Sequence, residues 1–219
     1  YLIDSLYLDT PRNDLFWAND HEVMNRFKLR VRTYPVDSCT SVFVEVKKRN
    51  NDVICKTRGQ LPKESWSDLV QRPSAQSMMS VPGKSRRAVE RFVSLTHSLN
   101  ATPRVLVRYE REPYMSVIDD YARVTFDRKV LSKRASKWEL ELPQETWRPV
   151  DNPLNTKTTN ESLTILELKF TSAVPLWMTN LVRRLQLQRL SFSKYATSVV
   201  AWHSGAGGYT WDKRTVAGW

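Results

Sequence analysis

The stretch Phe27-Lys28-Leu29-Arg30-Val31-Arg32-Thr33-Tyr34 decides the fold class, because it alternates apolar residues with cations. Successive side chains of a β-strand point to opposite faces of a sheet. The stretch therefore predicts a strand with one apolar face and one basic face, and Lys28, Arg30 and Arg32 share the basic face.

Several other segments also place charged or polar side chains on one face of a predicted strand. The groups are Phe43, Glu45 and Lys47; Lys56 and Arg58; Tyr109 and Arg111; Arg123, Thr125 and Asp127; and Glu167 and Lys169. Any single strand of an antiparallel sheet with one wet face shows this alternation. Many cationic strands together are different, because two like charges about 4 Å apart repel by on the order of 1 kcal/mol even in water. The clustering favours a bound anion.

Closing such a sheet into an antiparallel β-barrel would place the cations in a lumen, with the apolar faces outside under helices. A lower dielectric there would strengthen their attraction for phosphate. Arginine can hold two phosphate oxygens with its planar fork, while lysine acts as a point charge. Glu45 and Glu167 offer the hard oxygen ligands that Mn²⁺ or Mg²⁺ prefers.

The order of predicted elements indicates an α+β protein with an antiparallel sheet. Strands are predicted at residues 1–8, 27–34, 41–48, 53–61, 104–114, 121–131, 138–142 and 163–170. Helices are predicted at residues 14–19, 64–71, 85–99, 176–187 and 193–202, and residues 204–219 are expected to form a loosely held tail.

Composition favours one domain with an anionic partner. The chain has 219 residues, 41% of them hydrophobic, with 34 Lys and Arg against 23 Asp and Glu and a net charge of +11. Such a charge suits nucleic acid, an acidic membrane surface or a phosphate-rich small molecule. The sequence contains no glycine-rich phosphate loop followed by Lys-Ser/Thr, no dinucleotide fingerprint and no helical pair of metal-binding histidines.

Hydropathy and cysteine usage bear on the compartment. The mean hydropathy is −0.50, and no apolar stretch is long enough to span a membrane. The two cysteines, Cys39 and Cys55, show neither a metal-ligand spacing nor a redox pair, which is typical of a reducing, cytoplasmic setting.

Short motifs occur in order along nearly the whole chain. They are SLYLDTP from Ser5, KLRVRTY from Lys28, FVEVKKR from Phe43, KTR from Lys56, VRYEREPY from Val107, ARVTFD from Ala122, LELKF from Leu166 and SFSKY from Ser191. The ordered set resembles the polyphosphate-polymerase (VTC) domain, within the CYTH-like triphosphate tunnel metalloenzymes. The resemblance covers residues 1–203, and that family has a further strand before SLYLDTP, so we expect this chain to be part of a longer product.

The resemblance implies an antiparallel tunnel that binds ATP with Mn²⁺ or Mg²⁺ and transfers the terminal phosphoryl group to a growing polyphosphate chain. By position, the residues implied to line the tunnel and hold phosphates are Arg30, Arg32, Lys47, Lys56, Arg111 and Arg123. All of these except Lys56 are also expected to act in catalysis. Tyr109 would donate a hydrogen bond, Glu167 would bind the metal, and Ser193 with catalytic Lys194 would cap the tunnel. Strand parity adds Lys28, Arg58 and Lys169 as phosphate-binding residues and Glu45 as a second metal ligand.

Three other functions stay open. A hydrolase of the same fold would cleave triphosphate with water as the acceptor, and a module without catalytic activity would only bind polyphosphate. A nucleic-acid binder is the least expected, because its basic faces would lie on an open surface. No membrane span is expected in this chain, although a longer parent protein could associate with a membrane.

Overall fold

The computed structural model describes residues 1–35, 39–51, 53–115, 121–141, 147–151, 163–171, 173–189 and 192–203. Its strands are β1 (Leu2–Asp9), β2 (Asn25–Thr33), β3 (Ser41–Asn50), β4 (Val53–Pro62), β5 (Thr102–Met115), β6 (Ala122–Arg134), β7 (Arg148–Pro149) and β8 (Ile165–Phe170). Its helices are α1 (Asp14–Asp20), α2 (Trp66–Gln71), α3 (Ala75–Met79), α4 (Gly83–Ser98), α6 (Leu176–Arg184) and α7 (Lys194–His203). The predicted tail at residues 204–219 lies outside the described residues.

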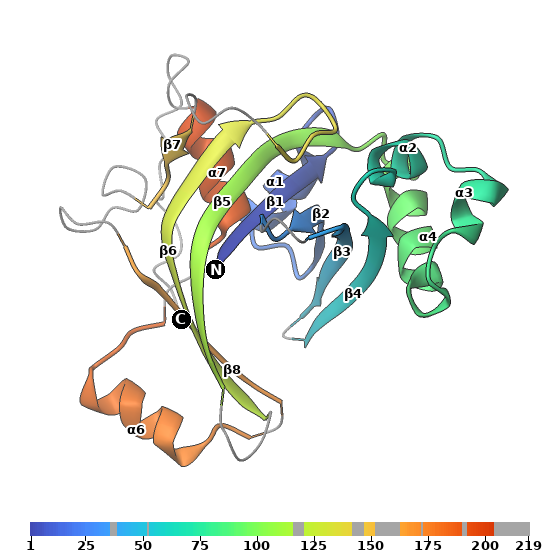
Figure 1. The fold of residues 1–219 in the computed structure, drawn as a ribbon. Coiled ribbons are helices and arrows are strands. Elements are labelled where there is room, and N and C mark those ends of the chain that lie inside the picture. The colour runs from blue at the N-terminus through green and yellow to red at the C-terminus, as the bar shows by residue number, and fades with distance from the viewer. Residues whose placement is uncertain are drawn as a thin grey trace.

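All strands belong to one antiparallel sheet in the order β4-β3-β2-β1-β5-β6-β7, and β8 pairs with the other end of β6. Long, bent strands β5 and β6 give the sheet a strong curl (Figure 1). The prediction of a closed barrel is wrong. Within the described residues β4 pairs only with β3 and β8 only with β6, so the two edges of the sheet are not joined. Alternation specifies the faces of strands, whereas closure depends on strand number, tilt and stagger.

The outer face of β2 and β3 carries the main hydrophobic core. Leu29 and Val31 of β2, and Val42, Val44 and Val46 of β3, are buried there with residues of α2 and α4. Helix α4 approaches β4 very closely at Gly59, where a Cβ atom would lie 2.7 Å from Val89 Cγ2 and 3.1 Å from the carbonyl oxygen of Ser85. A glycine is needed for this approach. The prediction of an apolar face under helices is confirmed here.

The position of α7 differs from the prediction that all helices pack outside. Tyr195 of α7 stacks on Tyr7 of β1, with ring centroids 5.0 Å apart, and Tyr7 lies on the same face as the basic residues of β2. Ile3, Val105 and Tyr109 complete a second core on this inner face. Apolar residues of β1 and β5 therefore seat α7 inside the curl.

The predicted strand at residues 138–142 is wrong for residues 138–141, which form no strand, and residue 142 lies outside the described part of the chain. Leu140 is buried and Trp138 packs against the same outer core, so a loop segment with two inward-facing apolar residues imitates the period of a strand. Helix α3 was not predicted; it is short and begins with a capping box between Ser74 and Ser77.

Helix α6 projects from the body of the molecule (Figure 1). Met178 is its only buried residue, while Leu176 is 73% and Trp177 48% exposed. Across the described residues, the structure has no helix with the length and hydropathy needed to cross a membrane.

Candidate anion site on the inner face of the sheet

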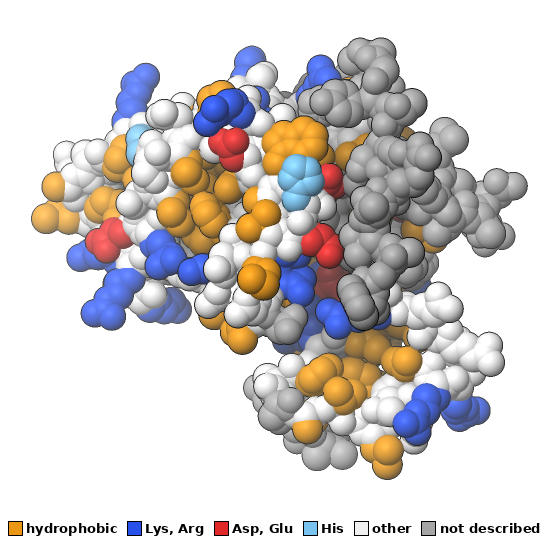
Figure 2. Space-filling model, turned by 180° about the vertical axis from the view of Figure 1, so that it is seen from behind, with side chains coloured by type: hydrophobic (Ala, Val, Ile, Leu, Met, Phe, Trp, Pro, Cys, Tyr) orange, Lys and Arg blue, Asp and Glu red, His pale blue; other side chains and the backbone are white. Residues whose placement is uncertain are grey.

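The inner face of the sheet gathers the charged residues that strand alternation predicts. Arg30 pairs in register with Glu45 on β3, and Glu45 pairs with Arg58 on β4. Lys28, Lys47 and Lys56 form the next row of the same face. We call the group formed by Lys28, Arg30, Arg32, Glu45, Lys47, Lys56, Arg58, Tyr109, Arg111, Asp127, Glu167, Lys169, Ser193 and Lys194 the charged face. Figure 2 shows cationic and acidic side chains together in a recess beside the projecting α6.

Glu45 lies at the centre of one half of the charged face and is fully buried. Arg30 Nε donates to Oε2 at 2.5 Å, while Lys56 Nζ lies 2.6 Å and Arg58 Nε 3.6 Å from Oε1. Burial alone would raise the pKa of this carboxyl, but Arg30, Arg32 and Lys56 outweigh burial and hold the pKa at about 2. Glu45 is therefore an anion that holds several cations in place.

Two tyrosines connect the basic row of β2 to β1 and β5. Arg32 donates to the hydroxyl of Tyr109 at 3.1 Å and to Ser5 Oγ at 3.3 Å, and Arg30 donates to the hydroxyl of Tyr7 at 3.3 Å. Burial raises the pKa of Tyr109 to about 12 despite the nearby arginines, so this phenol keeps its proton at neutral pH. Tyr109 can donate that proton in a hydrogen bond to an anion.

A second ionic cluster joins β5, β6 and β8 to α7. Arg111 donates two hydrogen bonds of 2.7 Å to the buried carboxylate of Asp127 and lies 3.2 Å from Glu167 Oε2. Lys194 Nζ lies 2.6 Å from Asp127 Oδ2 and 3.7 Å from Glu167 Oε1, and Lys169 lies 2.6 Å from Glu167 Oε2. Burial would raise the pKa of Glu167, but Lys194, Lys169 and Arg111 hold it at about 2.

The curl brings the two halves of the charged face within electrostatic reach. Burial and Arg30 lower the pKa of Lys47 on β3, and Glu167 and Lys169 on β8 also act on that pKa. β3 and β8 are far apart in the strand order of the sheet. Their charges therefore interact across the concave side of the sheet rather than along it.

Ser193 and Lys28 meet at the start of α7. Lys28 Nζ donates to Ser193 Oγ at 2.7 Å, and the backbone N–H of Ala196 donates to the same oxygen at 3.2 Å. With both lone pairs of Oγ occupied, the hydroxyl proton of Ser193 is available to an anion. Burial, together with Lys47, Arg26 and Arg30, lowers the pKa of Lys28 to about 7.

Asp9 at the end of β1 also anchors helix α7, through Tyr195. The hydroxyl of Tyr195 donates to Asp9 Oδ2, and Asp9 also accepts from the backbone N–H groups of Leu15 and Phe16 at 2.9 and 2.8 Å. These bonds connect the end of β1 to α1 and α7. They hold Ser193 and Lys194 over the charged face.

Arg123 is the predicted site residue that the structure does not bring into either cluster. It is exposed, faces Lys169 across the β6–β8 ladder, and forms no ion pair within the described part of the chain. Conversely, Ser5, Tyr7 and Asp127 touch the site but were not predicted as site residues. Strand parity offered a signal for Asp127, because it shares a face with Thr125. The SLYLDTP motif offered a signal for Tyr7, because the motif contains it.

The acidic residues fit a divalent metal unequally. Among the described residues no three His, Cys, Asp or Glu side chains are grouped as metal ligands would be. The carboxylates of Glu45 and Glu167 both contact cations through both oxygens, but they differ in exposure. Glu45 is fully buried, which suits a positioning role. Glu167 is 32% exposed and could contribute one carboxylate, with phosphate oxygens and water completing the shell that Mg²⁺ or Mn²⁺ requires.

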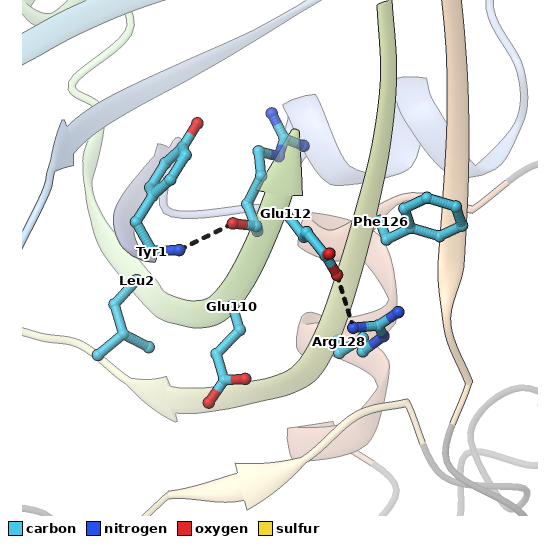
Figure 3. A pocket seen from close by; sticks show the side chains of 7 residues that line it. Tyr1, Leu2, Glu110, Glu112, Phe126 and Arg128 are labelled. Carbon is cyan, nitrogen blue, oxygen red and sulfur yellow. Dashed lines mark hydrogen bonds and ion pairs between the residues drawn. The ribbon is translucent and has the colours of Figure 1, made fainter. Parts of the chain in front are cut away.

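A pocket of about 270 Å³ at the start of β1 lies on the other face of the sheet. Glu110, Glu112, Phe126 and Arg128 line it, and Arg111 contributes its carbonyl oxygen, which accepts a 2.8 Å hydrogen bond from the amine of Tyr1 (Figure 3). Two carboxylates, Glu110 and Glu112, line it with the guanidinium of Arg128. It lacks the excess of cations that distinguishes the charged face.

Comparison with known proteins identifies the family. A model of the VTC domain matches residues 1–203. The chain belongs to the VTC domain family. No curated protein matches the chain. A solved structure described as a putative adenylate cyclase from Bacillus halodurans is similar over 88% of this chain and 78% of that chain, with 11% identity and a TM-score of 0.47. At this score the structural similarity carries no further weight, whereas the family match confirms the resemblance to the VTC domain.

Proposed function

We propose that this VTC domain binds the triphosphate of ATP on its charged face and transfers the terminal phosphoryl group to a polyphosphate chain. Membership of the VTC domain family supports a phosphate-rich ligand. The observation that carries the proposal is the excess of cations on one concave face: Lys28, Arg30, Arg32, Lys47, Lys56, Arg58, Arg111, Lys169 and Lys194, against Glu45, Asp127 and Glu167. An oligophosphate would supply the missing negative charge.

The mechanism is electrostatic. Phosphoryl transfer needs positioning and neutralisation of charge on the moving group more than it needs a protein nucleophile. Carboxylates hold Arg30 through Nε and Arg111 through Nε and Nη2, and the remaining N–H groups of both guanidiniums can donate to phosphate oxygens. An acceptor phosphate attacks the terminal phosphorus in line, the bond to the bridging oxygen breaks, and ADP leaves. Mn²⁺ or Mg²⁺, held by Glu167 and phosphate oxygens, would neutralise charge on those oxygens.

Incubation of the protein with ATP and Mn²⁺ is expected to yield a ladder of phosphate chains on a gel, because each transfer would lengthen the acceptor by one phosphate. Orthophosphate without a ladder would instead indicate a hydrolase of the same fold. Tight binding of tripolyphosphate without either product would indicate a polyanion-binding module. The matched control is Arg128→Ala, which removes an exposed arginine of the opposite face and should leave the ladder unchanged.

Binding of tripolyphosphate at pH 8 is expected to be accompanied by proton uptake at Lys28. The pKa of Lys28 is about 7 in the free protein, so the amine is mostly neutral at pH 8. Phosphate charge beside the amine raises its pKa, and the amine therefore takes up a proton. Calorimetry in buffers of different ionisation enthalpy should show less uptake for Lys28→Met than for the wild type. Equal uptake by both proteins would contradict the placement of Lys28 against phosphate.

A further inference from the structure

An aromatic group closes one end of the charged face. Tyr34 continues the face of Arg30 and Arg32, and Phe43 precedes Glu45 by two residues on the same face of β3. The ring centroids of Tyr34 and Phe43 lie 5.8 Å apart at an interplanar angle of 72°. Arg58 joins this group to the site, because it faces Glu45 across the β3–β4 ladder.

The guanidinium of Arg58 is held flat from several sides. Its central carbon lies 3.7 Å from the centre of the Phe43 ring. Nη2 donates to the hydroxyl of Tyr34 at 3.2 Å, and Nε lies 3.6 Å from Glu45 Oε1. The same guanidinium carbon lies 5.9 Å from the centre of the Tyr34 ring, so Phe43 is its closer aromatic contact. The Arg58 side chain is 36% exposed, so part of it is accessible to a ligand.

A flat cation stacked on an aromatic ring is a good platform for a nucleobase. Bases stack on guanidinium planes and on aromatic rings, and every base offers such a face. Two residues along a strand span about 7 Å, so Phe43 lies about 7 Å along β3 from the row of Arg30 and Arg58 and about 14 Å from the row of Lys28, Lys47 and Lys56. A nucleotide whose base lies on Arg58 could therefore direct its phosphates toward the lysine row.

We propose that Phe43, Arg58 and Tyr34 form a nucleobase-stacking subsite that orients a nucleoside triphosphate on the charged face. This inference rests on the proposed function and adds a direction to it. With the base at the Tyr34 end of β2, the terminal phosphate points toward Lys28 at the other end, where Ser193 and α7 lie. The acceptor chain would then approach from the α7 end.

The test compares two ligands that share a triphosphate but differ in the base. Calorimetric titrations with ATP and with inorganic tripolyphosphate are done on the wild type, Phe43→Leu and Phe126→Leu. Phe43→Leu should weaken ATP binding by about fivefold or more and leave tripolyphosphate affinity unchanged. Phe126 lies under Arg128 on the opposite face, with its ring centre 5.6 Å from the guanidinium carbon, so Phe126→Leu is a matched control that should change neither affinity.

Each other outcome overturns the inference. Equal weakening of both ligands by Phe43→Leu would mean that the ring only supports Arg58 as a phosphate ligand, and no change in either would mean that no base stacks there. If the wild-type protein binds tripolyphosphate but not ATP, the nucleobase subsite alone is contradicted. If it binds neither ligand, the proposed function is contradicted as well. A readout independent of any variant is the wild-type preference for ATP over UTP, expected at about twofold or more because purines stack more strongly; equal affinities would contradict the subsite.

Discussion

Replacing Arg111 by alanine should lower the free energy of unfolding by about 3–5 kcal/mol, because it leaves a buried carboxylate without its main partner. Asp127 has no exposed side-chain surface and receives both of its short arginine hydrogen bonds from Arg111. The expected fall in the free energy of unfolding is large because Asp127 is buried. Urea unfolding of the wild type and of Arg111→Ala measures the difference between their free energies of unfolding.

The double variant Arg111→Ala/Asp127→Asn separates the structural role of Arg111 from its role in binding. In Arg111→Ala the buried carboxylate keeps only Lys194 as an ionic partner, and neutralising it removes that poorly compensated charge, so part of the lost stability should return. Affinity for tripolyphosphate should remain lower than in the wild type by about 2 kcal/mol or more, since the guanidinium is still absent. A double variant with wild-type affinity would show that Arg111 serves the fold and not the ligand.

Replacing Glu45 by glutamine is the second change with a large expected effect. Glu45 carries the only negative charge in contact with Arg30, Lys56 and Arg58 within the described part of the chain. Without it, the three cations repel one another in a partly buried setting, and the free energy of unfolding should fall by about 3 kcal/mol. Thermal unfolding of the free protein should therefore begin at a lower temperature.

Tripolyphosphate should reverse this effect. An anion that binds only the folded state stabilises it, and the cations of Glu45→Gln have lost their internal counter-charge. The rise in melting temperature on adding tripolyphosphate should therefore be larger for Glu45→Gln than for the wild type. Glu112→Gln is the matched control: this exposed carboxylate on the opposite face pairs with Arg128, and its loss should leave the melting temperature and the ligand-induced rise close to those of the wild type. An equal or smaller ligand-induced rise for Glu45→Gln would show that no anion occupies its surroundings.

Local sequence correctly predicted which side chains of β2, β3 and β4 share a face. Lys28, Arg30 and Arg32 follow the period of a strand, and backbone geometry alone sends them to one side. The same period misled at Trp138 and Leu140, where a loop packs two apolar side chains on the outer core. An alternating apolar pattern indicates which side chains are buried, but a loop can show the same pattern without pairing as a strand.

The ionic partners in the site could not be predicted from periodicity. Lys194 and Asp127, which form an ion pair, are 67 residues apart in the sequence (194 minus 127). Lys28 and Ser193, which form a hydrogen bond, are 165 residues apart. Such contacts depend on where α7 settles. The site roles of the individual residues remain predictions that the variants described above will test.

Residue order and the two-residue period of a strand are enough to indicate the family, the antiparallel strand class and the separation of a basic face from an apolar one. The curl of the sheet without joined edges, and the place of α7 inside that curl, become visible only in the folded molecule. Strand twist, edge pairing and the burial of Tyr195 against Tyr7 and Asp9 arise when segments distant in the sequence pack together, so no local pattern specifies them.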